Sequence, residues 1–131
     1  MISILLVDDL PSMRQLLRII LLNHPDLQVV GEAENGRSAI QLALLMRPDV
    51  TVMDIAMPEL DGLTATKLLV SEQPEIRILI HSIHSSRSMV EEAFRAGARG
   101  YLMKDDTAGE LADAIRTVAA GGTYRSSSVA R

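Results

Sequence analysis

The sequence predicts an α/β domain in which a parallel β-sheet is covered by helices on both faces. Five short apolar runs alternate with longer stretches in which apolar residues recur every three or four positions, as in consecutive βα units. The runs are almost continuously apolar, which is typical of strands buried on both sides. With 131 residues, of which 47% are hydrophobic, the chain is expected to form a single domain around its own core.

The predicted strands are apolar runs bounded by charged or turn-forming residues. The opening run, ISILLV, ends at Asp8, and the run DVTVM ends just before Asp54. Such short runs between turn signals indicate strands rather than helices. In chain order, the five strands are expected at residues 2–7, 28–32, 49–53, 76–81 and 100–103.

The predicted helices follow from apolar residues at helical spacing between the strands. Pro11 suits the first turn of the first helix. The third is expected over 63–73, the fourth over 87–96 ahead of Gly97, and the fifth ends at Gly121-Gly122. The first, second and fifth helices carry the apolar stripes Met13, Leu16, Leu17, Ile20, Leu21; Ala39, Leu42, Ala43, Met46; and Leu111, Ala114, Ile115, Val118, Ala119.

Composition excludes several classes of function. A net charge of −4 argues against direct binding of DNA or RNA by these 131 residues, because such modules usually present a basic face. The absence of cysteine excludes disulfides, thiolate zinc sites and a cysteine nucleophile. The opening apolar run is too short for a signal peptide or a membrane span. We therefore expect a soluble cytoplasmic protein.

Polar residues collect at the predicted ends of four strands. Asp8 and Asp9 follow the first strand, Asp54 the third, Ser82 the fourth and Lys104 the fifth. In a flavodoxin-like, doubly wound sheet of order 2-1-3-4-5, the first and third strands are neighbours, and ligands bind at the carboxyl ends of the strands. Three carboxylates brought together in this way call for a cation. The sequence therefore predicts a Mg²⁺ site.

Four motifs occur in the order and spacing of a known family. The segments LLVDD, DIAMPELDG, ILIHS and GYLMK resemble those of the receiver domain of two-component response regulators. The segments GARGYLMKDD and ELADAIRTVAAGG resemble the NarL/FixJ-like subfamily, whose receivers normally precede a helix-turn-helix DNA-binding module. We therefore expect a receiver domain over 1–121 and a linker or disordered tail over 122–131, toward an output module absent from this sequence.

The resemblance implies roles for the acidic residues. Asp54 would be the phosphoacceptor, taking a phosphoryl group from a phosphohistidine on a sensor histidine kinase. Asp9, the Asp54 side chain and the main-chain carbonyl of Ala56 would hold Mg²⁺, with Asp8 acting through water. The protein would be a phosphorylation-controlled switch rather than an enzyme in the usual sense.

The resemblance also implies how the switch would work. Lys104 would pair with a phosphoryl oxygen, and the hydroxyl of Ser82 would move toward the new phosphate. Tyr101 would then turn inward behind it, changing the face made by the fourth helix, fifth strand and fifth helix. His84 is expected only as a neighbour of the phosphorylation pocket.

Simpler interpretations exist for individual residues. Asp8 and Asp9 suit a helix cap before Pro11, and Asp61-Gly62 suits a turn. Lys104 alone would suit a solvated edge charge, and Tyr101 plain packing. Two further positions depart from the common receiver pattern. Asp105 stands where many receivers have a cis proline, and Ile83 stands where a small residue is frequent, which would narrow access to Asp54.

Three functions remain as alternatives. The first is transcriptional control through a DNA-binding module outside this chain, and the second is a stand-alone receiver acting through protein docking or phosphorelay. The third, a small-molecule phosphatase or phosphotransferase, is disfavoured because no insertion is long enough to form a substrate lid. A homodimer is also expected, through the first and fifth helices or through the fourth-helix and fifth-strand face.

Overall fold

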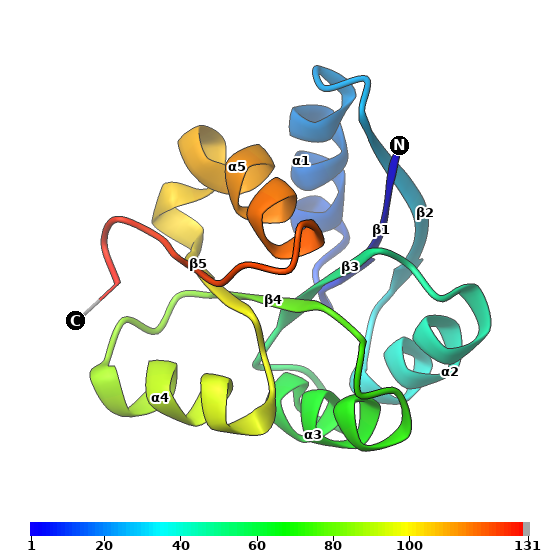
Figure 1. Cartoon of the computed structure of the whole chain (residues 1–131), viewed down its shortest axis with the longest axis vertical. Helices are drawn as coiled ribbons and strands as arrows, with labels where there is room; N and C mark the ends of the chain where they lie inside the picture. Colours follow the sequence, from blue (N-terminus) through cyan, green and yellow to red (C-terminus); the bar gives the residue numbers. More distant parts are fainter. Residues whose placement is uncertain (130–131) are drawn as a thin grey trace.

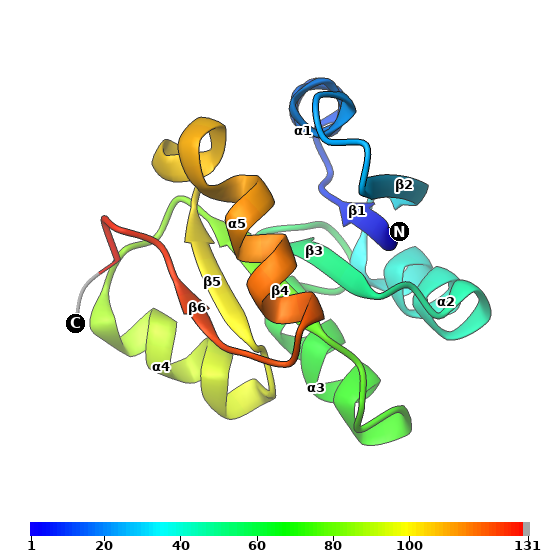
Figure 2. The same ribbon diagram turned by 45° about the horizontal axis from the view of Figure 1, so that its top comes forward.

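The computed structural model describes residues 1–129 and contains one parallel sheet covered by helices on both faces (Figures 1 and 2). The strand order is β2-β1-β3-β4-β5-β6, so the predicted order of the first five strands is confirmed. The strands are β1 (Ile2–Val7), β2 (Leu27–Ala33), β3 (Val50–Asp54), β4 (Ile78–Ser82), β5 (Gly100–Met103) and β6 (Tyr124–Arg125).

The helices divide into two layers. Helices α1 and α5 cover one face of the sheet, and α2, α3 and α4 cover the other (Figure 2). Their bounds are α1 (Pro11–Leu22), α2 (Gly36–Met46), α3 (Gly62–Glu72), α4 (Arg87–Ala96), the short 3₁₀ helix η1 (Lys104–Asp106) and α5 (Thr107–Ala119). Within the described part of the chain, no helix combines the length and apolar content that a membrane span requires.

Side-chain caps fix where three of the helices begin. The side chains of Asn35, Asp61 and Ser86 accept hydrogen bonds from backbone N–H groups in the first turns of α2, α3 and α4. Helix α4 ends at Gly97, which adopts a left-handed conformation with φ of 110°. A polar side chain in the preceding loop therefore starts each of these three helices, whereas α1 and α5 have no side-chain cap.

Two alternating sets of strand residues form the core. Ile4, Leu6, Val52, Leu79 and Leu102 pack toward α1 and α5. Residues one position away along each strand pack toward α2, α3 and α4. This alternation means that the residues two positions beyond Leu6, Val52, Leu79 and Leu102 project on the α1 and α5 side; they are Asp8, Asp54, His81 and Lys104.

The third and fourth strands each end one residue later than predicted. The structure includes Asp54 as the last residue of β3 and Ser82 as the last residue of β4, whereas both were expected just after their strands. In the register of the sheet, Asp54 pairs with His81 of β4 and Ser82 pairs with Met103 of β5. Both residues are buried. The polar side chains therefore stand on rigid backbone rather than on loops.

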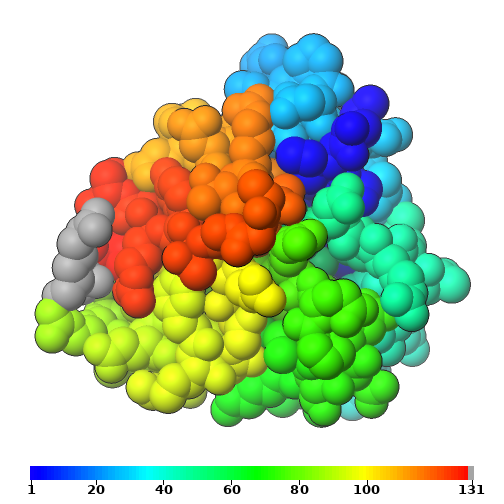
Figure 3. All heavy atoms as spheres, viewed as in Figure 1, coloured from blue at the N-terminus to red at the C-terminus, as the bar shows by residue number. Residues whose placement is uncertain are grey.

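The C-terminal segment adds a strand that the sequence does not predict. Tyr124–Arg125 pair in parallel with Gly100 and Tyr101 of β5, and Val129 is buried in the core. This segment lies between α4 and α5 on the surface (Figure 3). The expected linker or tail over 122–131 includes residues 130 and 131, which lie outside the described residues. That the segment leads to an output module stays a prediction.

Candidate functional site

Three carboxylates meet at the carboxyl ends of β1 and β3. These strands are adjacent, and their register pairs Val7 with Met53, so Asp8 and Asp54 emerge side by side. Together with Asp9 they each offer one carboxylate oxygen, and these oxygens all lie within 4.8 Å of one another. Their proximity, which the predicted strand order implied, gives the site a high density of negative charge.

Lys104 extends from the end of β5 into this cluster. Its Nζ lies 3.3 Å from Oδ2 of Asp8 and 3.3 Å from Oδ1 of Asp54. The lysine side chain is only 14% exposed, and the Asp8 side chain is fully buried. The alternative of a solvated edge charge does not hold, because the ammonium bridges two carboxylates from different strands.

Burial and charge crowding act on Asp54. Removal from water raises the pKa of its carboxyl group, and the neighbouring Asp8 carboxylate raises it further. The Lys104 ammonium and a 2.9 Å hydrogen bond from the Ile55 N–H to Oδ1 act in the opposite direction but do not cancel the increase. A cation at this site would favour the ionised form of Asp54.

The donor set fits Mg²⁺ in its chemistry. Carboxylate oxygens are the ligands that this hard cation prefers, and it commonly keeps several bound waters. A cavity of about 240 Å³ leads from the cluster to the surface and is lined in part by Asp9, Asp54, Ala56, Ser82, His84 and Lys104. The cavity provides room for water and for a small donor beside the carboxylates.

Leu10 and Ile83 also line this cavity. The side chain of Ile83 is 71% exposed, so it lies at the rim instead of over the carboxylates. The expectation that it narrows access to Asp54 therefore concerns the entrance only. His84 lines the same cavity, as predicted for a neighbour of the pocket.

Ser82 and Tyr101 are connected through the backbone of His84. The Ser82 Oγ accepts a 3.0 Å hydrogen bond from the His84 N–H, and the Tyr101 hydroxyl donates a 2.8 Å hydrogen bond to the His84 carbonyl. Both side chains are buried, with Tyr101 fully so. Tyr101 thus packs in the core and at the same time contacts the loop after Ser82.

The helix-cap interpretation of Asp8 and Asp9 is not what the structure contains. The residue before α1 is Leu10, and no side chain caps this helix. The Asp8 Oδ1 instead accepts a 2.9 Å hydrogen bond from the Leu10 N–H, which orders the turn after β1. The peptide bond between Lys104 and Asp105 is trans.

Gly62 supports the backbone of Asp54, a role that the sequence analysis does not predict. Asp61 caps α3, in keeping with the predicted turn, but a Cβ atom added at Gly62 would lie 1.9 Å from the carbonyl oxygen of Asp54. The Gly62 N–H also donates a 2.8 Å hydrogen bond to the Ile55 carbonyl. The glycine therefore lets α3 start directly against the end of β3, and its position just after DIAMPELD was the only available signal.

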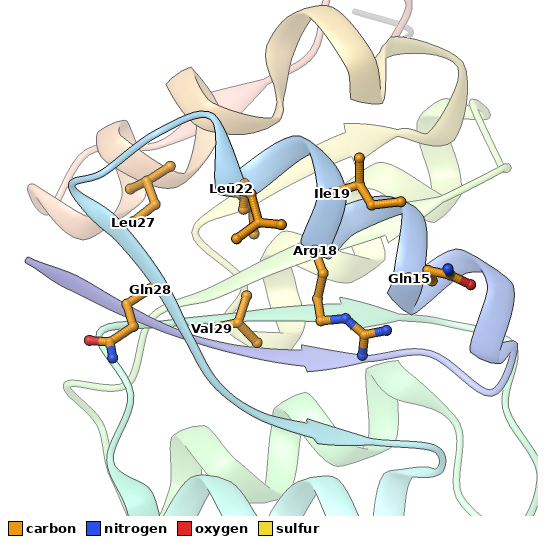
Figure 4. Close-up of a pocket in the computed structure, with 8 residues that line it drawn as sticks. Gln15, Arg18, Ile19, Leu22, Leu27, Gln28 and Val29 are labelled. Atoms are coloured by element: carbon orange, nitrogen blue, oxygen red, sulfur yellow. The ribbon is translucent and has the colours of Figure 1, made fainter.

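A larger cavity of about 460 Å³ lies elsewhere, between α1 and β2 (Figure 4). Its walls are mostly apolar and include Ile19, Leu21, Leu22, Leu27 and Val29, with Arg18 at one side. It contains none of the acidic cluster. Two members of the cluster, Asp9 and Asp54, line the smaller cavity instead.

Comparison with known proteins identifies close relatives. The family described as the response regulator receiver domain matches residues 4–116. The chain is 38% identical to the transcriptional regulatory protein DegU of Brevibacillus brevis over 94% of its own length and 52% of DegU. It is also 38% identical to the transcriptional regulatory protein LiaR of Bacillus subtilis, over 99% of its own length and 62% of LiaR. The chain thus spans little more than half the length of these relatives.

Solved structures agree with the sequence comparison. A two-component response regulator of the LuxR family from Aurantimonas superimposes with a TM-score of 0.94 at 34% identity, covering 98% of this chain and 91% of the other. The signal receiver domain of a NarL response regulator from Mycobacterium tuberculosis superimposes with a TM-score of 0.87 at 32% identity, covering 92% and 97%. The fold is therefore shared over nearly the whole chain.

Proposed function

Since the chain belongs to the family of response regulator receiver domains, we propose that it is a phosphorylation-controlled switch whose phosphoacceptor is Asp54. The observation that carries this proposal is the Lys104 ammonium, 3.3 Å from carboxylate oxygens of both Asp8 and Asp54 within a cluster of three aspartates. A buried nucleophile, a fixed cation and an opening to solvent suit phosphoryl transfer.

The chemical step uses the Asp54 carboxylate as nucleophile. A carboxylate oxygen attacks the phosphorus of a phosphohistidine on a sensor histidine kinase. The P–O bond to Asp54 forms as the P–N bond breaks, and the departing imidazole nitrogen keeps the bonding electron pair and takes up a proton from solvent. The Lys104 ammonium lies where it can pair with an oxygen of the transferred group and offset its charge.

Asp9, Asp54 and the main-chain carbonyl of Ala56 would hold Mg²⁺, with Asp8 acting through water. When bound, the cation neutralises charge on the transferring phosphoryl group. The raised pKa of Asp54 supports this assignment, because a cation would return the carboxyl group to the ionised form that attacks phosphorus. In this role the domain assists its own phosphorylation and is not proposed as an enzyme acting on external substrates.

Ser82 and Tyr101 would transmit the change. The Ser82 Oγ accepts from the His84 N–H, so a movement of this hydroxyl toward a phosphoryl oxygen would release that N–H. The Tyr101 hydroxyl donates to the carbonyl of the same residue. The loop after β4 would therefore shift together with the packing of Tyr101 on β5.

The output is proposed from the relatives. DegU and LiaR are described as transcriptional regulatory proteins, and this chain matches only 52% and 62% of their lengths. We therefore propose that the receiver controls a helix-turn-helix DNA-binding module outside these 131 residues and acts in the cytoplasm, with homodimerisation as one means of control. A stand-alone receiver acting by docking or phosphorelay is the alternative.

The test is phosphorylation of the purified protein with acetyl phosphate and Mg²⁺, followed by intact mass. The wild type should gain one phosphoryl group and Asp54→Asn none. Asp105→Asn is the matched control, because Asp105 is an exposed acid next to Lys104 that does not belong to the cluster. Phosphorylation of Asp54→Asn at the wild-type rate would exclude Asp54 as the acceptor.

A further inference from the structure

The imidazole of His81 lies beside the candidate site, yet the proposed function gives it no role. In the sheet register His81 pairs with Asp54, and both side chains project on the α1 and α5 side. His81 is only 1% exposed. Its neighbours on the same face of the sheet are Leu79, two positions earlier on β4, and Leu102, its partner on β5. A polar ring in such surroundings is costly unless it is hydrogen-bonded.

The ring is the start of a short chain of hydrogen bonds that ends at Lys104. His81 Nε2 lies 2.6 Å from the Thr107 Oγ1, and the Thr107 hydroxyl donates to the Lys104 carbonyl oxygen at 2.9 Å. A hydroxyl has a single proton, so both contacts are satisfied only when His81 Nε2 carries a proton and donates to Thr107. Burial and the nearby Lys104 lower the pKa of His81 to about 3, which keeps the ring neutral.

These hydrogen bonds end at Lys104, the residue whose placement matters most for the site. Lys104 leaves β5 and opens η1, and Thr107 is the first residue of α5. The Lys104 carbonyl is therefore held between the end of one strand and the start of one helix. Its side chain then spans to Asp8 and Asp54, so a rotation of this turn would move Nζ away from both carboxylates.

We propose that His81 and Thr107 are positioning residues for Lys104, which set the backbone from which its ammonium reaches the reacting carboxylate. The expected consequence, faster phosphoryl transfer to Asp54, rests on the proposed function. Packing alone does not explain the arrangement, because an aliphatic residue at 81 would fill a core position between leucines without requiring a hydrogen-bond partner on α5.

The first test compares Thr107→Val with Thr107→Ser. Valine keeps the shape of threonine but removes the hydroxyl, whereas serine keeps the hydroxyl. At saturating Mg²⁺, Thr107→Val should be phosphorylated by acetyl phosphate about 10- to 100-fold more slowly than wild type, and Thr107→Ser should recover most of that rate. The affinity for Mg²⁺ should not fall, because the aspartates stand on β1 and β3 and not on α5, and a displaced Lys104 ammonium would no longer compete with the cation for the Asp8 and Asp54 carboxylates.

A second pair of variants covers the case in which Thr107→Val does not fold. His81→Leu removes the donor, and His81→Gln places an amide N–H near the position of Nε2. The leucine variant should lose the phosphorylation rate, and the glutamine variant should retain more of it. Equal rates for the two variants would overturn the role of the hydrogen bond.

A third measurement does not depend on phosphorylation. Nitrogen-15 NMR of the metal-free protein should find His81 protonated at Nε2, and the Lys104 ammonium signal should shift in Thr107→Val but return in Thr107→Ser. If the wild type is never phosphorylated, the proposed function fails while these signals still decide the positioning role. An unchanged Lys104 signal in Thr107→Val, or equal shifts in both Thr107 variants, would overturn the inference.

Discussion

The phenolic hydroxyl of Tyr101 donates a 2.8 Å hydrogen bond to the backbone carbonyl of His84, in the loop between β4 and α4. The N–H of the same residue donates to the Ser82 Oγ. The loop at the mouth of the site is therefore fastened at one residue by groups from two adjacent strands. This connection is the physical basis for expecting Tyr101 to respond when Ser82 moves.

Tyr101→Phe should loosen this loop while leaving the core packed. The ring remains, so only the hydrogen bond is lost, and the free energy of unfolding should fall by about 0.5–1.5 kcal/mol. Amide exchange at residues 83–86 should become faster in the variant. Urea denaturation measures the first effect and hydrogen exchange by NMR the second; an unchanged exchange rate in the loop would show that the hydroxyl does not fasten it.

Gly62→Ala should displace the end of β3. An alanine Cβ would lie 1.9 Å from the Asp54 carbonyl oxygen, and the backbone on that side cannot move without shifting Asp54. We expect a loss of about 1–3 kcal/mol or more in unfolding free energy, as for other overpacked core sites, and weaker Mg²⁺ binding. Chemical denaturation and metal titration provide the measurements.

The matched control for this substitution is Gly109→Ala. A Cβ at Gly109, within α5, meets no atom within 4 Å. Gly109 is the third residue of α5, where alanine is at least as favourable as glycine, so this variant should be at least as stable as wild type. Equal effects of the two substitutions would mean that close contact with Asp54 is unimportant.

The sequence predicted the first five strands and the meeting of the aspartates for one physical reason. Apolar runs that end at Asp8 and Asp54 mark both the strands and their carboxyl ends, so the strand order alone brings the charges together. Lys104 follows the fifth apolar run, so the same reasoning places it at this edge of the sheet. The roles of these residues came from family resemblance, and they remain proposals.

Other features depend on contacts that no local pattern encodes. Strand β6 has only two residues, Tyr124 and Arg125, which pair with the edge of β5 after α5 has returned the chain to that side of the sheet. The partner of His81 is Thr107, 26 positions later, and the neighbour of Gly62 is the carbonyl of Asp54. Such long-range contacts appear only in three dimensions.

Ser126→Ala should loosen the C-terminal segment from β5. Ser126 is fully buried; its Oγ accepts a 2.9 Å hydrogen bond from the Met103 N–H, and its own N–H donates to the Tyr101 carbonyl. Removing the hydroxyl leaves the buried Met103 N–H unsatisfied, which should cost about 1–3 kcal/mol in unfolding free energy.

Ser127→Ala is the control for this segment. Ser127 is exposed, and its hydroxyl donates to the carboxylate of Glu110 at the surface, so loss of this hydroxyl should change the unfolding free energy by less than about 0.5 kcal/mol. Denaturant midpoints of the two variants, with amide exchange at residues 124–129, separate the outcomes. A smaller loss of stability in Ser126→Ala than in Ser127→Ala would mean that the exposed hydrogen bond to Glu110, and not the buried one to Met103, holds the segment against β5.

Removal of divalent cations should destabilise the protein at neutral pH. The pKa of Asp54 is raised in the folded state, so folded protein holds this proton more tightly than unfolded protein, and ionising Asp54 costs stability as the pH rises above 3.8. Added Mg²⁺ should offset this cost, by about 1.4 kcal/mol at tenfold its dissociation constant. Asp54→Asn should be more stable than wild type in EDTA and gain less from Mg²⁺; thermal unfolding with and without the metal tests both statements.

Asp26 should show the opposite dependence on pH, because the Arg116 side chain donates hydrogen bonds of 2.8 and 3.0 Å to its carboxylate. These bonds lower the pKa of Asp26 from 3.8 to about 2 in the folded protein. A depressed folded pKa means that the contribution of this pair to stability is fully present above about pH 4 and is lost as the pH falls through about 2. NMR titration of the Asp26 carboxyl should give the low pKa in the wild type and in Asp113→Asn, which removes the 3.6 Å contact of Arg116 within α5. In Arg116→Gln the pKa should return toward 3.8, and a value that stays near 2 would assign the shift to the backbone around Asp26 instead of to the arginine.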